Sequence, residues 1–220
     1  MKIWLMIGFV ACAAWACTGL ISKDTSLREE GEVLFSDRGF SVSYMEAQGL
    51  TVLPMANIRA SEGIRQNAIY EVYQALRIYF PKTQLVSQSE ALTQAKKLGL
   101  EKTVRDGVND YEQSHLLDSQ FIQQMYVMTQ TRYFLYLRIN DFDFSSKGGL
   151  VSKKVELEAE LWDSLCKKVV WSGVGRVGVV ESAQDERARF EEMFVSAARN
   201  LVVPLANGKK NRVNQGECVS

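Results

Sequence analysis

The chain has 220 residues, enough for one ordinary domain with appendages, and 46% of them are hydrophobic and 24% charged. Its 26 Lys and Arg residues balance its 26 Asp and Glu residues, so the formal net charge is zero. Because its paired lysines are dispersed and no basic cluster stands out, we do not expect it to bind nucleic acid or another polyanion.

The N-terminal stretch MKIWLMIGFVACAAWAC has the pattern of an export signal. One basic residue, Lys2, precedes an apolar run from Ile3 to Ala16. A run of about 14 residues is too short to cross a bilayer but suits the core of a signal peptide. The sequence therefore predicts that residues 1–16 are a signal peptide and that the protein is exported.

Two processing routes compete at this signal. Cys17, preceded by Ala16 and Ala14, resembles a lipobox, in which the cysteine thiol is acylated before cleavage, although Trp15 is bulkier than usual. Cys12 is a second lipidation candidate, behind a shorter apolar run. The other route is ordinary cleavage after Ala-x-Ala at 11–13 or 14–16, which leaves no lipid.

We expect lipidation at Cys17, and with it a membrane anchor. Thr18 follows Cys17 where an Asp would resemble an inner-membrane retention signal. The expected location is therefore the periplasmic face of the outer membrane in a host with two membranes.

The two remaining cysteines, Cys166 and Cys218, are a candidate disulfide. An oxidising periplasm permits the bridge, which would fasten the polar tail at 207–220 to the turn at Cys166. The alternative is two unpaired thiols, because the spacing specifies nothing.

Residues 17–47 read as a lipidated N-terminus and a polar tether. Within it, Val33-Leu34-Phe35 predicts a short strand and FSVSYMEA (residues 40–47) predicts an edge strand. A single domain is expected over residues 48–206.

The first half of that domain alternates short strands with helices. LTVLPM (50–55) and TQLV (83–86) predict buried strands. Helices are predicted from Ser61 to Phe80, ended by Pro81, and after the capping box Ser87-x-x-Glu90. Residues 101–114 read as a loop with some helix, and residues 115–131 read as a helix.

The second half predicts a β-meander followed by a helix. Three strands are expected within residues 132–144, 152–164 and 167–180, with a hairpin turn near Asp163–Lys167. A last helix is expected after Ser182-x-x-Asp185, with Pro204 and Gly208 ending it. The predicted class is α/β or α+β, with helices packed against one mixed, partly antiparallel sheet.

Sequence motifs for catalysis and cofactors are absent. GVGRVG (173–178) matches G-x-G-x-x-G, but the strand continues past the third glycine where a dinucleotide site needs a helix. We interpret these glycines as letting a twisted strand bend or approach a helix closely. No cofactor is expected.

Isolated polar residues carry little further signal. His115, the only histidine, has Ser114 and Asp118 along the same stretch, which does not reproduce a catalytic triad. Asp141 and Asp143 form a lone D-x-D motif, a weak cation signal, and Glu156, Glu158 and Glu160 point to one expected exposed strand face. We predict no catalytic residue and no metal site.

Element order and short patterns resemble a group of bacterial lipoproteins. LTVLPMAN entering a helix, TQLVSQSEAL and the hairpin VELEAELWDSLCKKVVWSGVG together look like the group that holds the curli-secretion channel lipoprotein, the lipoprotein activators of penicillin-binding proteins and TolB N-terminal-like domains. The resemblance covers roughly residues 48–203, and Asp163 stands where that group often has an Asp-led turn.

This resemblance implies a lipoprotein domain that works by protein contact. The chain lacks a pair of alternating segments of about 10 residues that would cross the outer membrane, so pore activity is not implied. We therefore expect a non-enzymatic binding or assembly factor for an envelope protein complex. The alternative is an oligomeric ring or channel component of a secretion system, built from copies of the chain.

Overall fold

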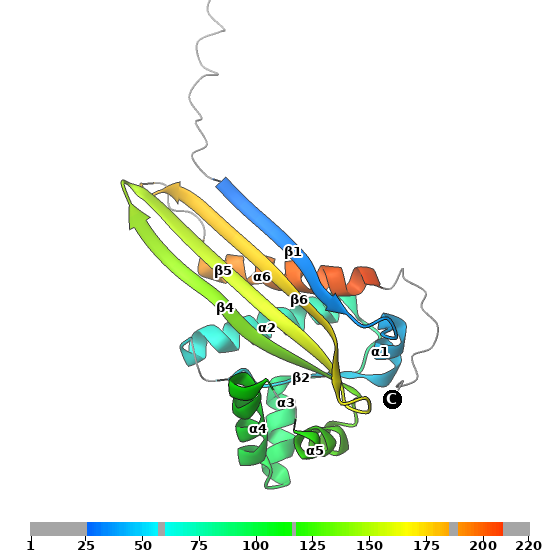
Figure 1. Cartoon of the computed structure of the whole chain (residues 1–220). Helices are drawn as coiled ribbons and strands as arrows, with labels where there is room; N and C mark the ends of the chain where they lie inside the picture. Colours follow the sequence, from blue (N-terminus) through cyan, green and yellow to red (C-terminus); the bar gives the residue numbers. More distant parts are fainter. Residues whose placement is uncertain (1–25, 57–59, 116–117, 185–188, 209–220) are drawn as a thin grey trace, which may run out of the picture.

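The fold is α/β, as predicted, with one six-stranded mixed sheet and six helices in the part of the chain that the structure describes. The structure is a computed structural model, and it describes residues 26–56, 60–115, 118–184 and 189–208. The strand order is β1-β6-β5-β4-β2-β3 (Figure 1). The elements are β1 (Ser26–Ser36), α1 (Val42–Gln48), β2 (Leu50–Val52), α2 (Glu62–Tyr79), β3 (Leu85–Val86), α3 (Gln88–Lys97), α4 (Glu101–Ser114), α5 (Ser119–Thr129), β4 (Tyr133–Lys147), β5 (Leu150–Asp163), β6 (Lys168–Ser182) and α6 (Phe190–Asn207).

Two kinds of strand pairing build the sheet. β4, β5 and β6 form the predicted antiparallel meander, and β1 pairs antiparallel with β6. β2 lies between β3 and β4 and is parallel to both. The predicted β-meander and C-terminal helix are therefore confirmed, but the helix begins at Phe190 with Arg189 as its N-cap residue, and Ser182, the predicted cap, is the last residue of β6.

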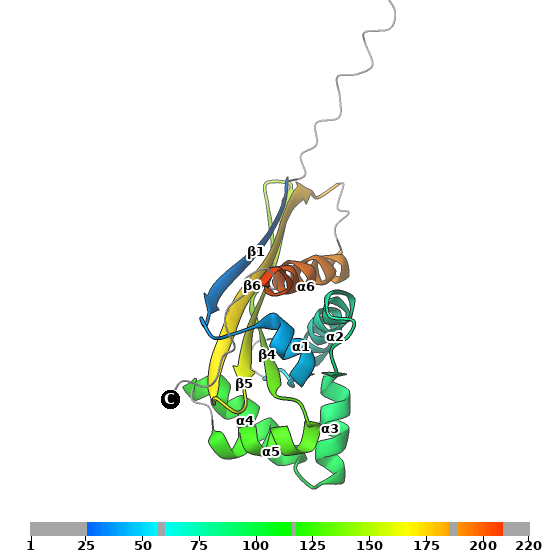
Figure 2. The same ribbon diagram turned by 90° about the vertical axis from the view of Figure 1, so that its right-hand side faces the viewer.

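The helices cover opposite faces of the sheet. β2 connects to β3 through α2, and β3 connects back past β2 to β4 through α3, α4 and α5. These crossovers run in opposite directions, so a right-handed path places their helices on opposite faces. One core accordingly packs α1, α2 and α6 against the sheet, and a second packs α3, α4 and α5 around Trp162 and Phe134 on the other face (Figure 2).

Helix α6 lies directly on the sheet at two glycines. Gly31 of β1 pairs with Gly175 of β6, and a methyl group on either would lie 2.1 Å from a carbonyl oxygen of α6, that of Asn200 or Ala197 respectively. Because β6 continues through residues 173–178, GVGRVG lies within a strand, and its close approach to a helix is confirmed at Gly175 but not at Gly178, where a methyl group would meet nothing within 4 Å.

Two N-terminal predictions needed revision. A strand runs through Val33–Phe35 as predicted, but it is the eleven-residue strand β1 rather than a short one. FSVSYMEA is not an edge strand but contains helix α1, because Val42 and Met45, three residues apart, are the positions that it buries. The first described residues thus belong to the sheet.

Two predictions at helices also needed correction. Residues 101–114, read as mainly loop, form the continuous helix α4, with Val104, Val108 and Tyr111 on its buried side. Pro204 does not end α6, which continues to Asn207. Its ring removes one helical N–H, and the carbonyl of Asn200, four residues earlier, faces Gly31 of β1 instead.

Candidate functional site

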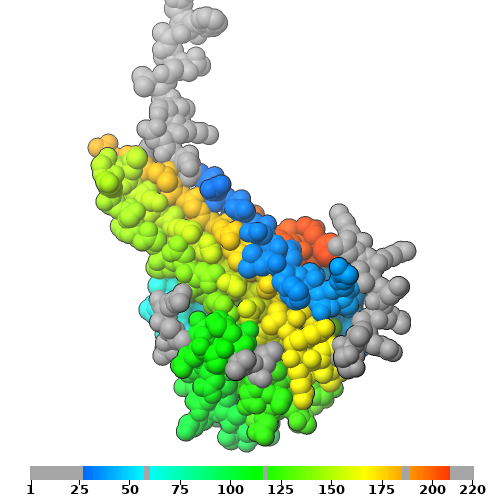
Figure 3. Space-filling view, in the orientation of Figure 1, coloured from blue at the N-terminus to red at the C-terminus, as the bar shows by residue number. Residues whose placement is uncertain are grey.

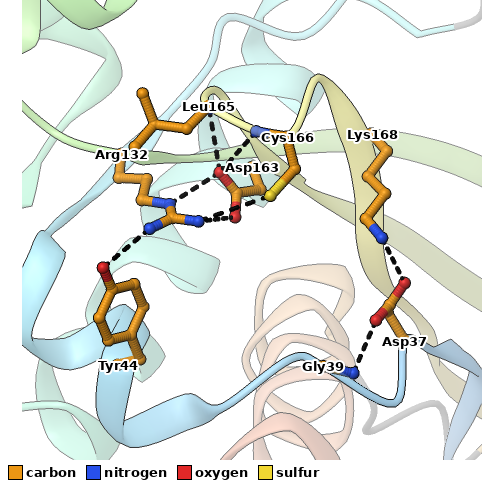
Figure 4. Close-up of polar contacts among 8 residues, drawn as sticks. All are labelled: Asp37, Gly39, Tyr44, Arg132, Asp163, Leu165, Cys166 and Lys168. Atoms are coloured by element: carbon orange, nitrogen blue, oxygen red, sulfur yellow. Dashed lines mark hydrogen bonds and ion pairs between the residues drawn. The ribbon is translucent and has the colours of Figure 1, made fainter. Parts of the chain in front are cut away.

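The β5–β6 turn is organised around the buried carboxylate of Asp163. Its Oδ1 accepts hydrogen bonds from the backbone N–H groups of Leu165 and Cys166, at 3.0 and 3.2 Å. Arg132, at the start of β4, donates to both oxygens, with 2.8 Å from Nε to Oδ1 and 2.6 Å from Nη2 to Oδ2 (Figure 4). Four N–H donors hold this carboxylate in place, and through it they hold the turn.

Arg132 connects this turn to helix α1. Its Nη1 donates to the hydroxyl of Tyr44 at 2.9 Å, and the guanidinium lies 4.9 Å from the centre of that ring. The hydrogen bonds to Asp163 raise the pKa of Arg132 despite its burial. Three segments that are far apart in the sequence therefore meet at one permanently charged group (Figure 4).

A second ion pair ties the segment before α1 to the start of β6. Lys168 Nζ lies 2.8 Å from Asp37 Oδ2, and Asp37 Oδ1 accepts from the backbone N–H of Gly39. The hydrogen bond from Lys168, followed by that from Gly39, lowers the pKa of Asp37. Both pairs position the chain rather than form a reactive centre.

The predicted cysteine sites lie mostly beyond the described part of the chain. Cys17 and Cys218 fall outside it, as does the alternative, Cys12. Cys166 lies in the β5–β6 turn beside Arg132 and is disulfide-bonded. Pairing with Cys218 stays a prediction, as does lipidation at Cys17.

The glutamates of β5 are paired rather than openly exposed. Glu160 accepts from Arg138 at 3.1 Å and from the hydroxyl of Tyr111, and Glu158 accepts from Asn140 at 2.5 Å. Burial and the bond to Glu160 raise the pKa of Tyr111, so the phenol stays protonated. Each of these two carboxylates thus has a polar partner on the sheet face.

Glu156 continues this network across the sheet. It lies 3.1 Å from Arg176 of β6, which also pairs with Glu32 of β1 at 2.8 Å. Burial works against its ionisation, but hydrogen bonds from Asn140, Arg176 and Lys154 hold the pKa of Glu156 below its usual value. The polar face therefore fastens β1, β6, β5 and β4 together, and Glu156 lacks the raised pKa of a general acid.

His115 and the D-x-D motif do not assemble a site. His115 ends α4 in a left-handed conformation with its ring edge against Tyr111, while Asp118 caps α5 by accepting from the N–H of Gln120. Asp141 pairs with Lys154 at 2.8 Å. Within the described residues, no group of three His, Cys, Asp or Glu side chains is placed to hold a metal ion.

Strand β1 forms a long open edge, which the sequence analysis missed. It pairs with β6 on one side only, and the side chains from Leu27 to Phe35 are exposed along its whole length. Figure 3 shows β1 in blue, uncovered along the surface. Four of these exposed side chains are large and apolar: Leu27, Val33, Leu34 and Phe35. Such an edge presents unpaired backbone groups beside apolar side chains, which is a template for pairing with another chain.

Comparisons with known proteins show distant structural similarity. No protein-family model matches the chain, and no curated protein matches it. It is similar to the PelC dodecamer from Paraburkholderia phytofirmans, with 16% identity, a TM-score of 0.45 and coverage of 83% of this chain and 97% of that one. It is also similar to lipoprotein GNA1162 from Neisseria meningitidis, with 18% identity, a TM-score of 0.47 and coverage of 72% and 98%. For the LpoB C-terminal domain from Salmonella enterica the values are 16%, 0.35, 59% and 82%. These values do not establish a family. Among the described helices, none has the length and apolar character needed to span a bilayer.

Proposed function

We propose that this protein is a lipoprotein, anchored through Cys17 on the periplasmic face of the outer membrane, that binds or assembles an envelope protein complex without catalysing a reaction. The observation that carries the binding role is the open edge of β1. It is an eleven-residue strand whose backbone groups on the side away from β6 have no strand partner in the described chain, with Leu27, Val33, Leu34 and Phe35 exposed. An added strand from a partner would satisfy the backbone groups and cover these side chains.

The polar clusters of the described chain support binding rather than catalysis. Asp163 accepts two hydrogen bonds from Arg132 and two from backbone N–H groups of its turn, and the β5 glutamates are engaged by Arg138, Asn140 and Arg176. A general acid, base or nucleophile needs a group left available to a substrate. Asp163 and the β5 glutamates instead hold strands and turns together.

Anchoring at Cys17 would keep β1 near the membrane. Ser26, the first residue of β1, lies nine positions after Cys17. An extended chain spans at most about 3.3–3.6 Å per residue, so this link reaches about 30 Å. The binding edge would therefore work close to the bilayer, where it meets membrane proteins and their complexes.

The partner is expected to be a different protein rather than a second β1 edge. Antiparallel self-pairing centred on Gly31 would place Glu30 directly opposite Glu32, and like charges facing each other across strands are destabilising. The alternative is a ring in which the β1 edge of one copy contacts a different surface of the next copy. Such a ring would be a stable oligomer in solution. Size-exclusion chromatography with light scattering tests it, because a strict monomer at high concentration excludes that ring.

A pull-down with edge variants tests the proposed binding role. The double substitution Leu34→Asp and Phe35→Asp adds charge to the edge while leaving its exposed positions exposed. We expect cross-linked envelope partners of the wild-type lipoprotein to be lost, with the melting temperature and membrane attachment retained. Ile78→Asp is the matched control, because Ile78 is an exposed apolar residue on α2. Equal partner recovery by the edge variant would contradict the binding role of β1.

A further inference from the structure

A cleft opens where two neighbouring parallel strands send their chains to opposite faces of the sheet. β2 leads to α2 on one face, and its neighbour β3 leads directly to α3 on the other. The carboxyl ends of such strands cannot be covered by either connection, which is why open α/β sheets bind ligands at these switch points. This position lies at the far end of the strand order from the β1 edge.

The cleft has the size of a small-molecule or peptide-end site. Its volume is about 320 Å³, at the lower end of the range for ligand pockets. Apolar side chains contribute part of its lining, with Met55 following β2, Leu92 on α3 and Val108 on α4. An apolar side chain of a ligand would be removed from water there.

Three amide side chains line the cleft without a hydrogen-bond partner among the described residues: Gln66, Gln88 and Asn109. Gln88 is the most enclosed of the three, at 9% exposed. Its amide reaches the cleft, where solvent contacts it, and makes no hydrogen bond to another described residue. The amide is therefore available to a polar group of a ligand, which would replace water there.

The charge of the lining favours an anion. The lining includes two guanidinium groups, Arg65 and Arg105, and one carboxylate, Glu62. Arg65 donates one N–H to the carbonyl of Ala60, and Arg105 uses Nη2 to pair with Glu101, so each keeps further donors. A planar guanidinium matches the geometry of a carboxylate.

We propose that this cleft binds the C-terminal end of a peptide chain, with its free carboxylate at Arg65 and Arg105. The amides of Gln88 and Asn109 would hydrogen-bond the peptide backbone, and the apolar floor would take the last side chain. Amide side chains both donate and accept, as a peptide group requires. The proposal goes beyond the proposed function, since it requires neither the lipid anchor nor the β1 edge.

Nuclear magnetic resonance of the ¹⁵N-labelled protein tests the site. The probes are the tripeptide Ala-Ala-Leu with a free carboxylate, the same tripeptide with an amidated end, and propionate as a free small acid. The readout is the side-chain NH₂ signals of Gln88 and Asn109. We expect the free-acid tripeptide to shift both signals and to bind about tenfold or more tightly than its amide, because hydrogen bonds to a charged group contribute about 1.5–3 kcal/mol.

The variant Gln88→Leu separates a binding role from a structural one. It should retain its melting temperature, because the Gln88 amide makes no hydrogen bond to another described residue, and should bind the tripeptide about threefold to tenfold more weakly. Gln94→Leu is the control. It lies on the same helix, has an amide oxygen that is buried without a hydrogen-bond partner, and does not line the cleft. It should bind as the wild type does.

Three results would overturn the proposal. Unchanged spectra with the free-acid tripeptide would exclude the site. Equal binding of the amidated tripeptide would exclude carboxylate recognition, and equal binding of propionate would exclude recognition of the peptide. Partner capture through β1 and attachment through Cys17 are measured separately, so these failures are distinguishable from failure of the proposed function.

Discussion

Replacing Gly175 with alanine would push helix α6 away from the sheet. The new methyl carbon would lie 2.1 Å from the carbonyl oxygen of Ala197 and 2.6 Å from the backbone nitrogen of Leu201, whereas ordinary contacts begin near 3.4 Å. The difference between 3.4 and 2.1 Å means that the helix must move by about 1.3 Å. Both obstacles are backbone atoms, so rotation of a side chain cannot relieve them.

The expected cost of this substitution is at the upper end of the range for overpacking. We expect Gly175→Ala to lower the free energy of unfolding by about 2–4 kcal/mol. At about 2–4 °C per kcal/mol for a domain of this size, the melting temperature should fall by roughly 5–15 °C. Thermal unfolding followed by circular dichroism measures it.

Gly178→Ala is the matched control for this prediction. Gly178 lies three residues further along the same strand, and a methyl group there would meet nothing within 4 Å. Its stability should stay within about 0.5 kcal/mol of the wild type. Equal melting temperatures for the two variants would refute the close seating of α6 on β6.

Three further predictions concern the polar contacts. Asp163→Asn leaves the buried charge of Arg132 without its carboxylate and should lower the free energy of unfolding, measured in urea, by about 3–5 kcal/mol. A loss below about 1 kcal/mol would contradict a stabilising role for the Arg132–Asp163 ion pair. The pKa of Glu90 is lowered by the backbone and side-chain hydrogen bonds of the N-cap residue of α3, so its stabilising contribution is present above pH 4.5 and is lost as the pH falls through the lower folded value. Wild-type stability should therefore fall more steeply than that of Glu90→Gln between about pH 5 and 3, and parallel curves would argue against this cap. Non-reducing peptide mapping should find Cys166 joined to Cys218, and Cys218→Ser should lower stability by about 2–4 kcal/mol, as expected for a bridge that closes a loop of about 50 residues. A Cys166 peptide that migrates without Cys218 would exclude that pairing.

Local sequence patterns predicted those elements whose capping residues, terminating residues and buried positions all lie within the element itself. Helix α2 begins after Ser61, whose hydroxyl accepts the N–H of Ile64, ends before Pro81 and buries Val72 and Leu76 at helical spacing. β5 alternates buried and half-buried residues along its length, as the sequence predicted. Each signal lies within one element and needs no knowledge of the partner segments.

Elements and sites that depend on distant pairing were missed. β1 is rich in glutamate and exposed, and what makes it a strand is pairing with β6, more than 130 residues later. The cluster at Asp163 has the same origin, since Arg132 and Tyr44 reach it from separate elements. The cleft at Gln88 exists because the chains that follow β2 and β3 lie on opposite faces of the sheet. For the β1 edge, the apolar run Val33-Leu34-Phe35 was the one local signal in the sequence.

The identity of the mature N-terminus tests the central claim most directly. Intact mass spectrometry of the protein from the membrane fraction should find a chain that begins at Cys17 and carries added lipid mass, and Cys17→Ser should release the protein into the soluble periplasm. A mature chain that begins at Ala14 or Cys17 without added lipid would contradict the account, as would continued membrane attachment of Cys17→Ser.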